Sequence, residues 1–166
     1  MATMRAKLRA HLGTRQVSRV IYGAIIGMAF VVAVQAHPPS AGDVAVGLVA
    51  TAMAVALAEL YSEIVGTETR TRRRVGAEHV REIVDDVLAV GFGVAFPAVF
   101  FVLAALGAME VDTAFRIAKW SGLGLIAFYG FCAARLAGRR VPAALLQAVA
   151  VGAIGAALIV LKALVH

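Results

Sequence analysis

Glu59 and Glu63 are the residues most able to do chemistry, because they lie in a stretch of sequence that is otherwise largely apolar. A spacing of four residues puts both carboxylates on one face of a helix. An ionised carboxylate inside a bilayer is costly unless it is paired, protonated or hydrated. We therefore expect a proton or cation site facing the interior of a helical bundle, with Tyr22 and Asp86 as supporting polar groups.

A structural role for the two glutamates is the competing interpretation. Both acids would then reach the cytoplasmic membrane interface and form ion pairs with arginines such as Arg19 or Arg135. This interpretation is the better one for Glu63, which is nearer to the polar segment that follows. For Glu59 the two interpretations are evenly matched, because ionisable groups within membrane spans are functional candidates by default.

His79 and Glu82 belong to a second polar cluster, which also contains Glu78, Asp85 and Asp86. An imidazole and a carboxylate three residues apart on a helix are candidate ligands for a divalent metal. The histidine precedes the glutamate, however, which reverses the Glu-x-x-His order of carboxylate metal sites in helical bundles. A solvated helix whose acids offset the neighbouring arginines is therefore favoured, and no cofactor is expected.

Long apolar runs position these residues. Of the 166 residues, 61% are hydrophobic, whereas a soluble domain has roughly 45–50%. A run of about 20 apolar residues matches the bilayer core, and continuous runs without alternation predict helices and not barrel strands. We predict an all-α polytopic membrane protein with one domain, 1–166, and a cytoplasmic polar segment at 67–86. The five predicted transmembrane helices are 17–36, 43–66, 87–109, 113–137 and 141–164.

The basic residues predict how the chain lies in the membrane. The net charge is +6, and most Lys and Arg residues flank the apolar runs on one side, in residues 1–19, the run Arg70–Arg74 and the link around Arg139. The positive-inside rule places the amino terminus in the cytoplasm and the carboxyl terminus outside a cell membrane. Such residues contact lipid headgroups, and a nucleic-acid partner is not expected. A cleavable signal peptide is the weaker interpretation of the start, because the apolar run is longer than about 7–15 residues.

Gly23 and Gly27 predict a flat face on the first span. Small residues four apart allow two helix backbones to approach closely. Such a face suits packing within the chain and formation of a homo-oligomer equally well. In the third span, Gly91, Gly93 and Pro97 predict a kink.

Two functions remain open at this point. The first is a small proton or cation transporter or channel that uses Glu59. The second is a non-catalytic membrane protein that binds lipid or another membrane protein, through its small-residue faces and Arg70–Arg74. The sequence lacks a phosphate-binding loop, a potassium-filter sequence and a nucleophile elbow, so an enzyme is the least favoured class. The transported ion or the ligand is not specified by the sequence.

Three short motifs suggest a family. These are Arg19-Val20-Ile21-Tyr22-Gly23 at the start of the first span, Ala58-x-x-Tyr61 near the end of the second, and the ending 160–166. With the Ala-, Val- and Arg-rich composition, the chain resembles small uncharacterised multi-pass integral membrane proteins of actinobacteria, the high-GC Gram-positive bacteria. The resemblance implies the multi-pass topology and no particular activity.

Overall fold

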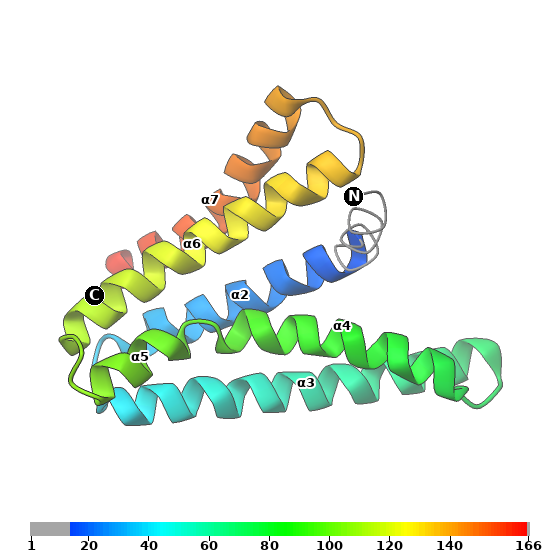
Figure 1. Cartoon of the computed structure of the whole chain (residues 1–166), viewed down its shortest axis with the longest axis horizontal. Helices are drawn as coiled ribbons and strands as arrows, with labels where there is room; N and C mark the ends of the chain where they lie inside the picture. The colour runs from blue at the N-terminus through cyan, green and yellow to red at the C-terminus, as the bar shows by residue number, and fades with distance from the viewer. Residues whose placement is uncertain (1–13, 166) are drawn as a thin grey trace, which may run out of the picture.

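Residues 14–165 are described by a computed structural model, and within this range the chain forms six helices and no strand. The basic lead-in expected before residue 14 lies outside the described residues, apart from the start of the first described helix. The helices form one bundle (Figure 1). They are α2 (Thr14–Val34), α3 (Ala41–Thr71), α4 (Ala77–Ala95), α5 (Ala98–Ala105), α6 (Val111–Leu136) and α7 (Val141–Val165).

Helix α2 is central to the bundle. It packs mainly against α4 and α6, and it has smaller contacts with α3 and α7. Helix α3 packs against α4 and α5, whereas α7 lies mainly along α6. The first described helix thus connects the α3–α4–α5 side of the molecule with the α6–α7 side (Figure 1).

The outer surface of the bundle is rich in large apolar side chains. On α3, Leu57 is 66% exposed, and Val46 and Met53 are also exposed. Similar side chains are exposed on α4, α6 and α7, including Leu88, Phe128 and Val149. Soluble proteins rarely expose apolar surface on this scale. The chain is therefore an all-α membrane bundle whose outer side chains face lipid.

Three helices are long and apolar enough to cross a membrane by length and composition: α2, α3 and α6. Helices α4 and α5 pass the same test together, with a bend of 47° at the break between them, and make a fourth span if the pair is counted as one. Within the residues searched, α7 contributes the shorter apolar stretch Val141–Ala157. The described residues thus support three or four spans where five were expected, and the fifth stays a prediction.

The bend in the predicted third span lies at Phe96 and Pro97. Helix α4 ends at Ala95, and α5 begins at Ala98. Proline lacks the amide proton needed to continue the hydrogen-bond ladder, and its ring clashes with the preceding turn. The kink predicted from Pro97 is therefore present. Gly93, which was expected to contribute to the kink, has instead a packing role in the contact with α2.

The predicted polar segment 67–86 is mostly helical. Helix α3 continues beyond Gly66 to Thr71 and is 31 residues long, or about 46 Å at 1.5 Å per residue. It ends where Arg72 adopts a left-handed backbone conformation, with φ of 52°, and donates its amide proton to the Glu68 carbonyl. Helix α4 then starts at Ala77. A short turn separates the two helices. Both helices extend past the apolar runs, because Glu, Thr and Arg are compatible with a helix outside the membrane.

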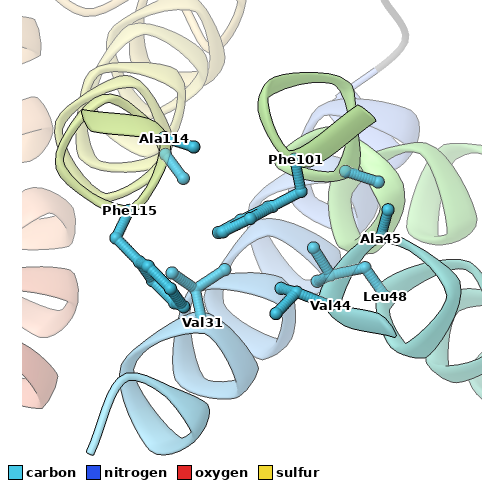
Figure 2. Packing of buried hydrophobic residues seen from close by; sticks show 9 residues of the cluster. Val31, Val44, Ala45, Leu48, Phe101, Ala114 and Phe115 are labelled. Atoms are coloured by element: carbon cyan, nitrogen blue, oxygen red, sulfur yellow. The ribbon is translucent and has the colours of Figure 1, made fainter. Parts of the chain in front are cut away.

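Apolar packing fills the bundle near the ends of α2 and α5. Phe101 and Phe115 meet edge to face, with ring centroids 4.8 Å apart, and Figure 2 shows Val31, Val44 and Leu48 around them. These side chains come from α2, α3, α5 and α6. Aromatic pairs of this geometry stabilise a core beyond their buried area, so this cluster holds four helices together.

Candidate functional site: an arginine shared by two carboxylates

Arg19 joins α2 to α3 through two ion pairs. Its Nη1 atom contacts Glu59 Oε1, and its Nη2 atom donates a hydrogen bond of 2.6 Å to Glu63 Oε1. The two glutamates are four residues apart, so one guanidinium can reach both carboxylates from the facing helix. All three side chains are largely buried, with 20–21% of each exposed. A planar fork of donors suits this double contact, which a lysine could not reproduce.

A second arginine borders the cluster. Arg70 Nη2 lies 4.0 Å from Glu63 Oε2, and the Arg70 side chain is 73% exposed. Arg72, Arg73 and Arg74 follow in the α3–α4 turn and are exposed. Exposed ion pairs are weak, so Arg70 adds positive charge at the rim of the cluster and little stability.

An open pocket of about 430 Å³ lies beside the ion pairs, lined by Ser18, Arg19, Tyr22 and Glu59. Ser18 and Tyr22 are one helical turn apart on α2 and are exposed at this surface. Arg19 and Glu59 form the charged wall. All four lining residues carry polar groups, although they lie on helices whose outer side chains are largely apolar. This contrast makes the pocket the best candidate site in the described part of the chain.

The depth of the pocket follows from the length of α3. Eighteen residues separate Ala41 from Glu59, which is about 27 Å of helix, close to the ~30 Å hydrocarbon thickness of a bilayer. If Ala41 lies near one membrane surface, Glu59 lies near the other. The structural interpretation of the two acids thus has the expected partner, Arg19, whereas Arg135 donates to the Arg139 carbonyl instead.

The four transport candidates are only partly brought together. Tyr22 and Glu59 line the pocket, and Glu63 is linked to it through Arg19. Asp86 is buried, with 6% exposed, on α4, and it is absent from the pocket lining. The grouping of Asp86 with Glu59 is therefore not seen at this pocket.

His79 and Glu82 contact each other at the start of α4. The His79 Nδ1 and Glu82 Oε2 atoms are 3.2 Å apart, and both side chains are exposed. Among residues 14–165, no group of three or more His, Cys, Asp or Glu side chains is arranged to hold a metal ion. A single exposed pair supplies too few ligands for a closed metal site, so the metal site gains no third ligand here and stays a prediction.

Gly23 and Gly27 lie on the other face of α2, against α4. A Cβ atom on Gly27 would come within 2.6 Å of the Val94 carbonyl oxygen, and one on Gly23 would overlap the Val90 carbonyl oxygen. From the other side, a Cβ atom on Gly93 would come within 2.6 Å of the Ala24 nitrogen. The flat face predicted for the first span therefore packs within the chain, with Gly93 as its unpredicted counterpart.

Comparisons with family models, with curated proteins and with solved structures give no match to this chain. The resemblance to actinobacterial membrane proteins thus stays a prediction.

The sequence predicts Arg19 as one of several ion-pair partners of the two acids and not as the centre of the site, and it does not single out Ser18. An arginine inside an apolar run is itself a signal, because its charge must be compensated at membrane depth. Ser18 carries no such signal, since an exposed serine near a helix start is common.

Proposed function

We propose that this chain is a non-catalytic integral membrane protein that binds a membrane lipid, with the lipid headgroup in the pocket formed by Ser18, Arg19, Tyr22 and Glu59. The observation that carries the proposal is an open pocket, lined by four residues with polar groups, on the side of an otherwise apolar bundle. If Ala41 lies near one membrane surface, the length of α3 puts this pocket near the other surface, where lipid headgroups are always present.

The surface next to the pocket suits an acyl chain. One turn further into the bundle from Tyr22 is Ile26, and one turn before Glu59 is Val55; both are partly buried and pack against Ala52, Val90 and Val94. Helix α4 supports both α2 and α3, which have few direct contacts with each other. A bound lipid would thus meet polar side chains at its headgroup and apolar side chains at its tail.

The proposed location is the cytoplasmic leaflet of a cell membrane. The start of α2, the Arg70–Arg74 turn and the α6–α7 turn with Arg139 and Arg140 lie toward the same end of the bundle (Figure 1). Clustered arginines favour the cytoplasmic side. Single cysteines replacing Thr71 and Ser40 should accordingly react with impermeant reagents from opposite sides of the membrane, and labelling of both from one side would contradict this orientation.

Proton or cation transport is a second candidate, because the pocket reaches Glu59. One observation makes it weaker. The interior beyond the pocket is filled by buried apolar residues such as Val20, Val90 and Val94. Transport would require a hydrated path along that interior.

Filling the pocket tests the proposal. Ser18→Trp should occlude it, whereas Ala33→Trp adds the same bulk at an exposed position near the other end of α2. Delipidated protein would be titrated with phospholipid and analysed by native mass spectrometry. We expect one lipid bound to the wild type and to Ala33→Trp, and loss of that lipid in Ser18→Trp. Equal lipid binding by both variants would contradict the proposal.

The same variants separate the second candidate. If the protein transports a cation, wild-type liposomes should show a flux that Ser18→Trp abolishes and Ala33→Trp preserves. Such a flux, together with unchanged lipid binding in all three proteins, would favour transport over lipid binding.

A further inference from the structure

The charges around the pocket do not suit a purely anionic headgroup. Arg19 is the only cation among the four lining residues, and its guanidinium already serves both Glu59 and Glu63. The two charged lining residues, Arg19 and Glu59, carry opposite formal charges, so the lining has no net positive charge to hold an anion. A lone phosphate or a carboxylate entering the pocket would compete with two carboxylates for one guanidinium.

A primary ammonium group fits the same wall better. Within the described part of the chain, the ion-pair contact of Glu59 is made by its Oε1 atom, so the second oxygen of this pocket-lining carboxylate is able to accept further hydrogen bonds. An ammonium has three donors and the complementary charge. Arg70, 4.0 Å from Glu63 and largely exposed, adds positive charge beside the ion pairs, and a phosphate attached to the ammonium would be attracted toward it.

A quaternary ammonium fits less well. It has no N–H donor to offer a carboxylate, and proteins recognise it with cages of several aromatic rings. Among the described residues that line this pocket, Tyr22 is the one aromatic. A choline headgroup would therefore be held here neither by N–H hydrogen bonds nor by an aromatic cage.

We infer that the pocket selects phospholipids that carry a primary amine, of the ethanolamine type, over choline and glycerol headgroups. This inference rests on the proposed lipid-binding function and names the lipid class for the same site. Glu59 accepts hydrogen bonds from the ammonium, and Arg70 beside the ion pairs attracts the phosphate. The selectivity arises from the N–H donors of the headgroup, which the Glu59 carboxylate can accept and which choline and glycerol phosphate do not offer as a charged group.

The test compares headgroups on wild-type protein. Phosphatidylethanolamine, its N-methyl and N,N-dimethyl derivatives, phosphatidylcholine and phosphatidylglycerol would compete for the delipidated protein in detergent, read by native mass spectrometry. Affinity should fall stepwise with each methyl group. The total preference for ethanolamine over choline should be about tenfold, or about 1.4 kcal/mol, the scale of one charge-assisted hydrogen bond. Equal binding of ethanolamine and choline lipids, or tighter binding of phosphatidylglycerol, would overturn the inference and leave lipid binding itself intact.

Two further arms complete the test. Glu59→Gln should lose the ethanolamine preference, whereas Glu82→Gln, an exposed acid outside the pocket, should retain it. Water-soluble phosphoethanolamine should compete poorly, because it lacks the acyl chains. If it displaces the lipid at equal concentration, the site recognises a soluble amine and the lipid assignment is wrong. The methylation series needs no variant, so it decides the inference even if Glu59→Gln does not fold.

Discussion

Helix α2 makes two contacts of opposite kinds. Toward α4, glycines bring two backbones together with no side chain between them, at Gly23, Gly27 and Gly93. Toward α3, a long arginine reaches two glutamates beside an open pocket. A side chain added at the first contact would disrupt the fold, because the atoms it would meet belong to the backbone of α4 and cannot move aside. The second depends on long side chains that can adjust, so the two faces of one helix differ in how much change they tolerate.

The largest expected effect is at the glycine contact. Gly23→Leu combined with Gly27→Leu would place side chains onto the Val90 and Val94 backbone. Overpacking usually costs about 1–3 kcal/mol per site, and more where the obstacle is rigid. We expect loss of folded, monodisperse protein in detergent, measured by size-exclusion chromatography and thermal unfolding.

Gly66→Leu combined with Gly124→Leu is the matched control for this change. Neither glycine has an atom within 4 Å of an added Cβ atom, so this double variant should remain folded. Wild-type stability of the Gly23 and Gly27 double variant would show that the close backbone approach is not required.

Removal of the shared cation should have the next largest effect. Arg19→Gln leaves Glu59 and Glu63 without their common partner in a largely buried position. Because one-fifth of each side chain is exposed, we expect a loss of about 1–3 kcal/mol, between the values for exposed and buried pairs. Arg19→Lys should restore only part of the thermal stability, since it keeps the charge and loses the fork. Full restoration by lysine would contradict the two-pronged contact.

The smallest effects are expected at the two carboxylates, and they should differ in kind. Glu63→Gln should reduce thermal stability by about 1 kcal/mol or less, since Arg19 retains Glu59. Glu59→Gln should have a similar effect on stability but a larger one on lipid binding, because only Glu59 lines the pocket. Equal losses of lipid affinity in the two variants, measured by titration, would place Glu63 in the binding wall as well.

The sequence was sufficient to predict some elements and not others. Hydropathy located the first, second and fourth spans closely, because lipid exposure requires continuous apolar surface. It placed the end of the second span at residue 66, whereas α3 continues to Thr71, because a helix does not end where the membrane ends. Pro97 produced the predicted bend, since the missing amide proton acts locally.

The pocket was less predictable than the helices. The spacing of Glu59 and Glu63 fixes their common face, but the choice between Arg19 and Arg135 as partner depends on which helices are neighbours. The role of Gly93 also depends on which helices are neighbours, because its contact with α2 joins residues far apart in the sequence. The burial of Asp86 also depends on how α4 packs, and the sequence placed Asp86 both in the polar cluster after α3 and among the supporting groups of an interior site.

Headgroup photolabelling tests directly whether a lipid headgroup binds in the α2–α3 pocket, as we propose. A phosphatidylethanolamine analogue with a diazirine in the headgroup would be bound at one lipid per chain, irradiated, and the labelled peptides identified by mass spectrometry. We expect the label on the peptides containing Tyr22 and Glu59, and its loss in Ser18→Trp. Label spread evenly over α6 and α7, with no enrichment at Tyr22 or Glu59, would contradict the account.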